Sequence, residues 1–355
     1  SILRARSSFR LGREAMSKRT IAVLGGTGFI GRHVLARLVR DGHDVIALTR
    51  SRERHRDLLV LPGLRLLECD PYDALDLHQA LEGCDTVINL VGILNEKGRD
   101  GAGFRAAHGE LTRRVVAVCN DRGIERFLHM SALRADAANG ASHYLRSKGE
   151  AEDHIRQEAG AGLLWTIFRP SVVFGRGDGF IERFRSLLRT LPVLPLARPN
   201  ARFAPVFVTD VATAMAHALD RAESAGVTYQ LCGPRVYSLK ELVTLIARWS
   251  GRRPKIIGLP DGLARMQAAM MDYVPGKPFS TDNFRSLTVH SICEKEAPGL
   301  RALDVLPTPL EAIAPAYLAP PHRVVPGTPG ASASNRASSA SRSDPGSSPS
   351  DSQRS

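Results

Sequence analysis

Thr20-Ile-Ala-Val-Leu-Gly-Gly-Thr-Gly-Phe-Ile-Gly31 is the stretch that decides how this chain of 355 residues folds. The apolar run 21–24 has the length of a buried parallel strand. Gly25, Gly28 and Gly31 follow it, and the next residues carry apolar side chains at helical spacing. The glycines therefore lie between a strand and a helix, which is the context of a dinucleotide-binding turn.

Each glycine has a physical role in such a turn. Gly25 lets the chain leave the strand, Gly28 leaves room for a pyrophosphate, and Gly31 lets the helix pack closely on the strand. The N-terminus of the helix faces the phosphate charge. We therefore predict that a nicotinamide dinucleotide binds here, with a purely structural tight turn as the alternative.

Strand and helix patterns continue to alternate along the chain, which is typical of a parallel sheet. Further strands are predicted at 44–49, 64–68, 85–91, 126–131 and 165–168. We expect an α/β fold, a Rossmann-like doubly wound parallel sheet with a small C-terminal α/β lobe. The lobe is predicted to contain the strands at 203–208, 228–231 and 255–259, the helix after Asp210, and a helix whose capping box is Ser238 and Glu241.

Four regions are expected. Residues 1–18 are a disordered or mis-assigned N-terminal extension, 19–175 the nucleotide-binding core, and 176–319 a lobe interleaved with that core. Residues 320–355 are rich in Pro and Ser and are predicted to be disordered. The first residues imitate a mitochondrial transit peptide, and the alternative we favour is a true start at Met16.

Composition excludes several classes of protein. The net charge is +12, of which residues 1–19 carry +5 and residues 320–355 carry +2. The charge of the middle is thus a poor argument for nucleic-acid binding, and no specific nucleic-acid partner is predicted. No apolar run is long enough to span a membrane. The five cysteines show no paired spacing and are expected to be reduced thiols, and no metal site is predicted.

The end of the second strand bears on the choice of nucleotide. An acidic residue at this place binds the ribose 2′-hydroxyl of NAD, but this chain has Thr49 and Arg50, followed by Arg52. A guanidinium can bind a 2′-phosphate in bidentate fashion, whereas a carboxylate would repel it. We therefore favour NADP(H), with NAD(H) as the alternative. The alternative is that these arginines simply lie on a solvated loop, in which case they give no reason to prefer NADP(H).

Tyr144 and Lys148 are spaced four residues apart and share a helix face. A neighbouring ammonium and a positively charged nicotinamide ring would lower the phenol pKa, so that Tyr144 could exchange a proton with a substrate oxygen. Ser131, at the end of the fifth strand, would hold the same oxygen. We predict Ser131, Tyr144 and Lys148 as catalytic residues. The alternative is that Tyr144 and Lys148 only hold the ribose of the nucleotide.

An apolar stripe near the C-terminal end has two interpretations. Leu263, Met266 and Met270 recur on one face of a predicted helix, with Met271 at the edge of the stripe. The simpler interpretation, which we favour, is that the stripe packs into the lobe as core. The alternative is an exposed surface for a membrane or a partner helix, since methionine suits adaptable apolar contacts.

The glycine spacing, Gly-x-x-Gly-x-x-Gly with Thr27 inside it, resembles the short-chain dehydrogenase/reductase superfamily. Segments 131–136, 144–150, 168–175, 208–212, 233–242 and 282–287 resemble a narrower group. That group contains an accessory subunit of respiratory complex I, subunit nine of the alpha subcomplex, and its bacterial relatives, which are atypical members related to NAD-dependent epimerases and dehydratases. The resemblance covers about residues 19–318.

The resemblance implies further site residues. Asp70 would cap the adenine pocket, unless it is only a turn residue before Pro71, and the turn that begins at Arg169-Pro170 would lie beside the nicotinamide. Together with the glycine turn, the predicted nucleotide-binding residues are Gly25, Thr27, Gly28, Phe29, Ile30, Gly31, Arg50, Asp70, Val91, Gly92, Tyr144, Lys148, Arg169 and Pro170.

The resemblance also implies a function: tight NADPH binding by an accessory or assembly protein linked to complex I or ubiquinone metabolism, contacting a respiratory-complex or membrane-surface partner. It implies a cytoplasmic protein at the periphery of the respiratory membrane, or a matrix protein if the source is eukaryotic. The alternative is an active NAD(P)-dependent reductase, epimerase or dehydratase that acts on a small carbonyl or sugar-nucleotide substrate through Tyr144 and Lys148.

Overall fold

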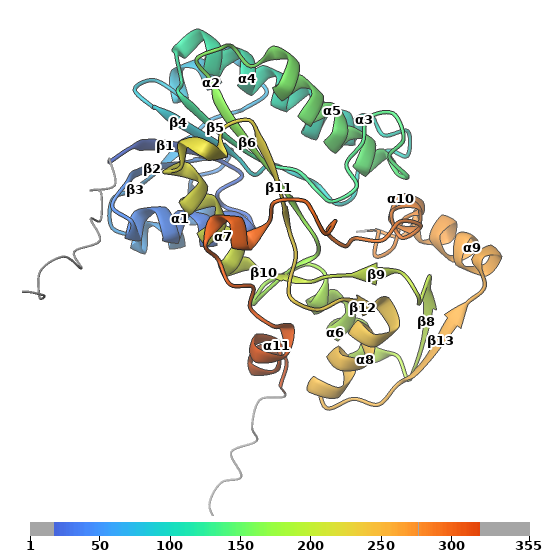
Figure 1. Ribbon diagram of the computed structural model, residues 1–355. Helices are drawn as coiled ribbons and strands as arrows, with labels where there is room; N and C mark the ends of the chain where they lie inside the picture. The colour runs from blue at the N-terminus through green and yellow to red at the C-terminus, as the bar shows by residue number, and fades with distance from the viewer. Residues whose placement is uncertain (1–17, 276, 320–355) are drawn as a thin grey trace, which may run out of the picture. The chain divides into compact units, whose positions relative to one another are not determined.

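A computed structural model describes residues 18–275 and 277–319, and Figure 1 shows their arrangement. Seven parallel strands form the main sheet in the order β11-β6-β5-β4-β1-β2-β3. They are β1 (Thr20–Leu24), β2 (Asp44–Thr49), β3 (Leu64–Glu68), β4 (Thr86–Asn89), β5 (Arg126–Met130), β6 (Leu164–Pro170) and β11 (Val227–Leu231). The prediction of a Rossmann-like, doubly wound sheet is confirmed. The predictions for residues 1–17 and 320–355 lie outside the described residues.

Helices cover both faces of this sheet (Figure 1). On one face α1 (Phe29–Arg40) packs against α7 (Val208–Leu219), and on the other lie α2 (Ala74–Ala80), α4 (Leu111–Arg122) and α5 (His143–Glu158). Successive β1 side chains point to opposite faces, so Ile21 and Val23 join one apolar core while Ala22 and Leu24 join the other. Both faces are buried, which is why the strands read as continuous apolar runs.

The strand order reverses beside β1, and this places the glycine turn next to the end of β4. In the register of these two strands Leu24 lies opposite Asn89, so Gly25 and residues 90–92 leave the sheet side by side at its carboxyl edge. Ligands of open α/β sheets bind in the crevice at this switch point.

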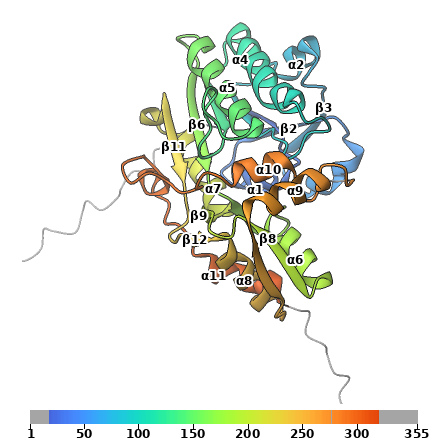
Figure 2. The ribbon, with the colours of Figure 1, turned by 90° about the vertical axis from the view of Figure 1, so that its right-hand side faces the viewer.

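The lobe is built from three two-stranded sheets and several helices (Figure 2). The pairs are β7 (Val173–Phe174) with β10 (Val206–Phe207), β9 (Arg202–Phe203) with β12 (Tyr237–Ser238), and β8 (Val193–Ala197) with β13 (Lys255–Leu259). The helices are α6 (Ile181–Thr190), α8 (Leu239–Trp249), α9 (Asp261–Met271), α10 (Thr281–Ser286) and α11 (Leu310–Leu318). The capping box of α8, formed by Ser238 and Glu241, is confirmed.

Two elements that we assigned to the lobe belong to the main layers instead. β11 pairs in parallel with β6 as the edge strand of the main sheet, with Thr228 opposite Ile167. α7 packs on α1. The chain thus returns to the sheet after it has begun the lobe, a crossing that local sequence patterns do not reveal because both layers use the same strand and helix signals.

The expectation that all five cysteines are free thiols is wrong. Cys232 and Cys293 form a disulfide across a separation of 61 residues. Cys232 follows β11, and Cys293 lies on a returning segment whose residue Pro298 accepts a hydrogen bond from the Gln230 backbone amide. Such a pairing depends on tertiary contacts and leaves no spacing signal. Cys69, Cys84 and Cys119 are free.

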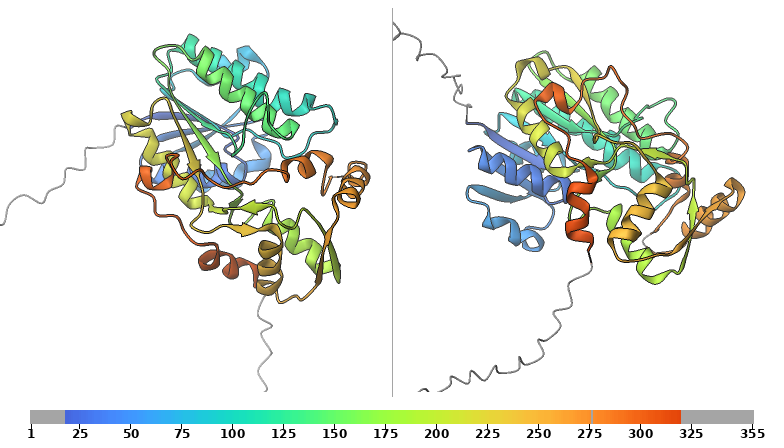
Figure 3. Two further views of the ribbon diagram at one scale, coloured as in Figure 1. Left: turned by 45° about the vertical axis from the view of Figure 1, so that its right-hand side comes forward. Right: turned by 60° about the horizontal axis from the view of Figure 1, so that its bottom comes forward.

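The apolar stripe of α9 is exposed, so our preference for a core role is wrong. The exposed fractions are 49% for Leu263, 56% for Met266 and 65% for Met270. The helix instead buries Ala264 and Ala268, which pack with Phe284 of α10 in a small core. The small side chains allow the close approach, and the large ones are left on the opposite face. Figure 3 shows α9 and α10 together at the side of the lobe.

Candidate functional site

The glycine turn is as tight as the sequence predicts. Gly25 has φ of +73°, and a Cβ there would lie 2.8 Å from the carbonyl carbon of Leu90. A Cβ on Gly31 would lie 2.4 Å from the carbonyl oxygen of Gly25. Gly28 is the N-cap of α1 and has no side chain to bond the first helical amides. Those amides and the helix dipole are therefore available to a phosphate group.

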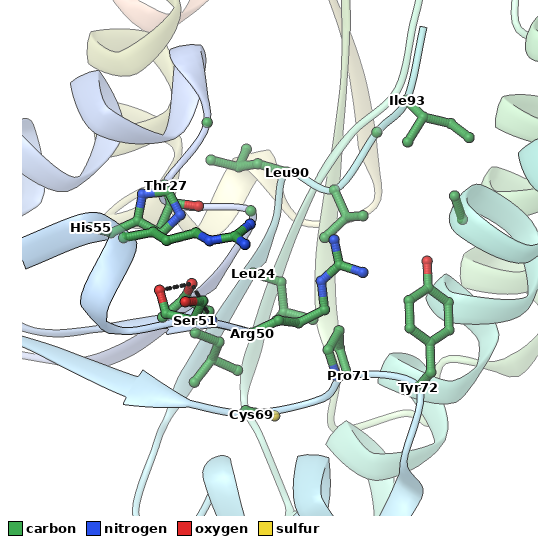
Figure 4. Close-up of a pocket in the computed structure, with 18 of the residues that line it drawn as sticks. Leu24, Thr27, Arg50, Ser51, His55, Cys69, Pro71, Tyr72, Leu90 and Ile93 are labelled. Atoms are coloured by element: carbon green, nitrogen blue, oxygen red, sulfur yellow. Dashed lines mark hydrogen bonds between the residues drawn. The ribbon is translucent and has the colours of Figure 1, made fainter. Parts of the chain in front are cut away.

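A cavity of about 940 Å³ opens in front of this turn (Figure 4). Thr27 and Gly28 line one side, and residues 90–93 line another. The far end is lined by Arg50, Arg54, His55, Pro71 and Tyr72. Figure 4 shows the Arg50 side chain extending into the open space between Thr27 and Tyr72. The volume lies within the range of ligand pockets, and the cradle fits a dinucleotide.

The charges around this cavity have one sign. Arg50 and Arg54 bring two guanidinium groups to it, beside His55, and none of the residues that line it is an aspartate or a glutamate. Instead of an acidic side chain, the end of β2 offers Thr49, whose hydroxyl accepts a hydrogen bond from the Ser51 amide at 3.3 Å. This arrangement suits an anionic group on the ribose and gives a neutral hydroxyl no carboxylate to bond.

Asp70 lies beside the cavity rather than among its lining residues. Its Oδ1 accepts a hydrogen bond from the Tyr72 amide at 3.1 Å, and its own amide donates to Asp76 at 2.7 Å. These bonds hold the turn that presents Pro71 and Tyr72 to the cavity. The role we predicted for Asp70 at the adenine stays a prediction.

A second cavity, of about 470 Å³, adjoins the first and shares Gly25, Gly28, Leu90, Gly92 and Ile93 with it. It brings together residues that are far apart in the sequence. The predicted residues that line it are Phe29, Ile30, Gly31, Ser131, Tyr144, Lys148 and Pro170. Val91 lines only the larger cavity. Arg169 lines neither of these cavities and instead pairs with Glu152, as described below.

Tyr144 lies in the first turn of α5, which Asp282 of α10 holds from outside. The carboxylate accepts hydrogen bonds from the amides of His143 at 2.7 Å and Tyr144 at 3.1 Å. The Tyr144 ring stands edge-on to the rings of Phe104 and His108. Burial raises the pKa of the Tyr144 phenol to about 12. This value reflects the protein groups alone, among which desolvation of the phenolate dominates; the lowered pKa that we expect beside a positively charged nicotinamide ring stays a prediction.

Lys148, one turn further along α5, is buried. Its ammonium donates to the carbonyl oxygens of Met130 at 2.9 Å and Val91 at 3.4 Å. Burial lowers the pKa of Lys148 to about 8, opposed by the charge of Glu152. The lysine therefore joins the ends of β4 and β5 beneath the nucleotide path, and a modest change of pH alters its charge.

The Ser131 hydroxyl is bonded to a buried carboxylate. Its Oγ donates to Glu152 Oε1 at 2.5 Å. Arg169 donates to both oxygens of Glu152, at 2.7 and 2.6 Å, and Arg156 donates to Oε2 at 2.6 Å. Glu152 is fully buried and is thus balanced by two guanidinium groups.

His108, which local sequence patterns do not reveal, lines neither cavity but contacts the Tyr144 ring and the loop after β4. Its Nε2 lies 3.0 Å from the Ile93 amide, which donates to it, so Nδ1 carries the proton and donates to Ser147 Oγ at 2.8 Å. Ser147 in turn donates to the carbonyl of Tyr144. Burial and the nearby Lys148 charge hold the pKa of His108 well below its usual value, so the ring is neutral.

This chain of hydrogen bonds connects the loop after β4 to the turn of α5 that carries Tyr144. His108 lies in a short π-helix, Arg105–Glu110, just before α4. Such irregular turns are frequent at functional sites, but residues 105–110 read as ordinary helix, so no sequence signal pointed to His108.

No helix in the described part of the chain is both long and apolar enough to cross a membrane. Within residues 18–275 and 277–319, no three His, Cys, Asp or Glu side chains are grouped so that they could hold a metal ion.

Comparison with known proteins agrees with this geometry. A family of NAD(P)H-binding proteins matches residues 25–179. Over 307 residues the chain is 31% identical to the NADH dehydrogenase (ubiquinone) 1 alpha subcomplex subunit 9, mitochondrial, of Rattus norvegicus, and the match covers 84% of this chain and 80% of that protein. The chain belongs to the family of that subunit. The predicted family and an NAD(P)-binding core are thereby confirmed.

Relatives outside the respiratory complex carry reductase names. The chain is 28% identical over 261 residues to the ceramide reductase of Caulobacter vibrioides, covering 72% of this chain and 78% of that one. Among solved structures, a nucleoside-diphosphate-sugar epimerase from Staphylococcus aureus has a TM-score of 0.64 at 18% identity, with 82% and 98% of the two chains covered. That likeness shows the fold alone. The roles of the individual site residues remain predictions.

Proposed function

We propose that this protein holds NADP(H) as an accessory or assembly protein linked to respiratory complex I or quinone metabolism, and does not turn the nucleotide over rapidly. The family relationship supports the link to the complex, since relatives named as its subunits align with most of the chain. One observation carries the choice of retention over turnover: the Ser131 hydroxyl donates its hydrogen bond to Glu152 rather than toward the cavity.

The chemistry of the other candidate residue supports the same choice. A general acid works best when its pKa lies near the working pH. Burial alone raises the pKa of Tyr144 to about 12, so the protein groups by themselves do not bring the phenol near that optimum. With Ser131 bonded to Glu152, a carbonyl in the smaller cavity would meet a weak acid and no second donor from the serine. Proton delivery, and with it turnover, would be slow.

The preference for NADP(H) over NAD(H) is part of this proposal. Arg50, Arg54 and His55 line the far end of the larger cavity, and none of the residues that line it is acidic. A 2′-phosphate placed there would find charge-assisted donors, whereas a 2′-hydroxyl would find no carboxylate acceptor. The glycine cradle accommodates the pyrophosphate in either case.

The location we propose is the periphery of the respiratory membrane: the cytoplasmic side in a bacterium, the matrix side in a mitochondrion. The exposed stripe Leu263, Met266 and Met270 of α9 supports this, with Arg265 between its members. An exposed apolar stripe of this kind suits either a membrane surface or a helix of a partner subunit. The relationship to the complex I subunit favours a partner subunit that lies at the membrane surface, so that the stripe would meet both.

A second candidate function is a working reductase. It is favoured by the meeting of Ser131, Tyr144 and Lys148 at one cavity beside the glycine turn, and by the ceramide reductase relative. NADP(H), when bound, would supply a hydride there. Tyr144 would hold the transferable proton at its Oη, and Lys148 would fix the loop after β4 through the Val91 carbonyl.

The experiment that separates the two functions uses the purified full-length protein. The bound nucleotide is identified after release, and the protein that carries NADPH is then mixed with a panel of carbonyl compounds. The proposal predicts that the nicotinamide absorbance stays unchanged. Oxidation of the NADPH within seconds, at a rate that Tyr144→Phe lowers by roughly 10²–10⁴-fold, would establish the reductase instead.

A further inference from the structure

Much of the lining of the smaller cavity is apolar. It is formed by residues of both the main sheet and the lobe: Leu133, Val172, Phe180, Phe203, Leu287 and Val289. Leu94, which is 59% exposed, adds a further apolar side chain to the lining. A ligand that fills this space must therefore cover the walls with carbon rather than with hydroxyl or phosphate groups.

The charged side chains that line this cavity are both engaged. Arg134 pairs with Glu294 at 3.1 Å and also donates to the carbonyls of His290 and Ile292. Lys148 donates to two main-chain carbonyls. A phosphate here would meet no free guanidinium and would lose its hydration without compensation. This contrasts with the larger cavity, where Arg50 and Arg54 have no ion-pair partner among the described residues.

Hydrogen-bond donors in the smaller cavity are almost all used within the protein. The Ser131 hydroxyl donates to Glu152. The Ser171 hydroxyl donates to the carbonyl of Ser291, and the Ser286 hydroxyl donates to Ser142. Tyr144 differs, because its Oη has no hydrogen-bond partner within the described part of the chain. The Asn283 side chain donates to the Leu94 carbonyl at 3.4 Å and accepts from the Ser280 amide. The free phenol is therefore the clearest partner for an acceptor oxygen of a ligand.

The outer wall is held in place before any ligand arrives. Leu287, Val289 and Ser291 form it, and the Ser291 amide donates to the carbonyl of Arg202 at 2.8 Å. The Ser291 carbonyl accepts from Ala204 at 3.1 Å. Two residues on, the Cys232–Cys293 disulfide ties the same segment to the end of β11. A wall fixed from both the lobe and the main sheet loses little entropy on binding.

We propose that the smaller cavity binds a neutral, largely apolar carbonyl compound, with its oxygen on Tyr144 Oη and its carbon chain along the Leu287 and Val289 wall. Phosphorylated ligands, sugar nucleotides included, are disfavoured, because Arg134 is paired with Glu294 and the Lys148 ammonium already donates to two carbonyl oxygens. This proposal rests on the proposed function in one respect: NADP(H) occupies the side of the cavity formed by the glycine turn. The ligand class is the same whether or not the bound carbonyl compound is reduced.

The test is calorimetric titration of the full-length protein, with and without NADPH, using three probes. They are 2-decanone, decyl phosphate, which has a comparable tail on an anionic head, and UDP-glucose. We expect 2-decanone to bind at least tenfold more tightly than decyl phosphate, and UDP-glucose to give no binding at this cavity. In the NADPH-loaded protein, where the nucleotide covers Arg50 and Arg54, equal or tighter binding of either phosphate compound would overturn the proposal.

Two substitutions locate the binding. Val289→Glu puts a charge into the half-buried outer wall and should abolish 2-decanone binding while NADPH still binds. Val236→Glu, at a residue 50% exposed and outside the cavity lining, is the matched control and should change nothing. Tyr144→Phe should weaken 2-decanone roughly tenfold. Unchanged 2-decanone binding in Val289→Glu would refute the location.

The two proposals fail separately. NADPH affinity is measured on the same samples, and its absence in the parent protein contradicts the proposed function. The apolar wall would still bind 2-decanone in that case, since none of its residues depends on the nucleotide. Normal NADPH binding together with no 2-decanone binding would overturn only the present inference.

Discussion

Ser131 Oγ lies 2.5 Å from Glu152 Oε1, so a hydroxyl that lines the smaller cavity donates into the protein. Glu152 is fully buried and lies on α5 one turn beyond Lys148. Its negative charge offsets the guanidinium groups of Arg156 and Arg169. The serine is thus one part of a charged network that links the ends of β5 and β6 to α5.

The first prediction is that this network stabilises the fold. Glu152→Gln leaves two guanidinium groups without a counter-charge, and breaking a buried pair in this way typically costs about 3–5 kcal/mol. Ser131→Ala removes one hydrogen bond to the same carboxylate and should cost only about 0.5–1.5 kcal/mol. Urea unfolding of the two variants measures the difference. Equal losses would show that the ion pairs contribute nothing beyond the serine bond.

The second prediction separates ligand binding from folding in the glycine turn. A Cβ at Gly28 would meet only the Gly25 carbonyl, at 3.3 Å, whereas one at Gly31 would lie 2.4 Å from it. Gly28→Val should therefore leave Tm nearly unchanged and abolish nucleotide binding, because the branched side chain enters the pyrophosphate site. Gly31→Ala should lower Tm markedly. Retained nucleotide affinity in Gly28→Val would place the ligand elsewhere.

The third prediction is a pH dependence. The pKa of Lys148 without nucleotide is lowered to about 8, and an anionic ligand would raise it, since it favours the protonated form. Binding of NADPH is therefore strongest below pH 8 and weakens as pH rises through and beyond that value. Lys148→Met should bind more weakly at neutral pH and show a flat profile over this window. A parent affinity that rises above pH 8 would contradict the role of the lysine.

The fourth prediction concerns α9. Met266→Glu combined with Met270→Glu adds charge to side chains that are 56% and 65% exposed, so the fold and NADPH binding should survive. The double variant should no longer co-sediment with respiratory membranes or their complexes. Leu75→Glu, at a residue 68% exposed on α2, is the control and should still sediment. Continued sedimentation of the double variant would move the partner surface elsewhere.

Local sequence patterns predicted most of the main sheet but not the path of the chain between its layers. Strands β2 and β3 match the predicted residues 44–49 and 64–68, because each is a short apolar run between turn residues. The membership of β11 in the main sheet could not be predicted, since its pairing with β6 joins residues about 60 positions apart. The same holds for the Cys232–Cys293 disulfide.

The candidate site could also be predicted only in part, because local spacing reveals some of its residues and long-range contacts define the others. Tyr144 and Lys148 stand one helical turn apart, and spacing revealed them. Glu152 and His108 did not stand out, because their importance comes from burial beside partners on other elements. The contribution of burial to the pKa of Tyr144 could not be foreseen either, since it depends on how completely the surrounding side chains exclude water.

The central claim is that the larger cavity holds NADP(H), and titration of the parent protein and of Arg50→Asp with NADPH and NADH tests it most directly. Arg56→Asp is the control, because Arg56 pairs with Glu53 and does not line the cavity. We predict tighter binding of NADPH than of NADH by the parent and by Arg56→Asp, with roughly 1.5–3 kcal/mol contributed by the charge-assisted contact, and the reverse order in Arg50→Asp. Equal affinities of the parent for the two nucleotides, or no binding of either, would contradict the account.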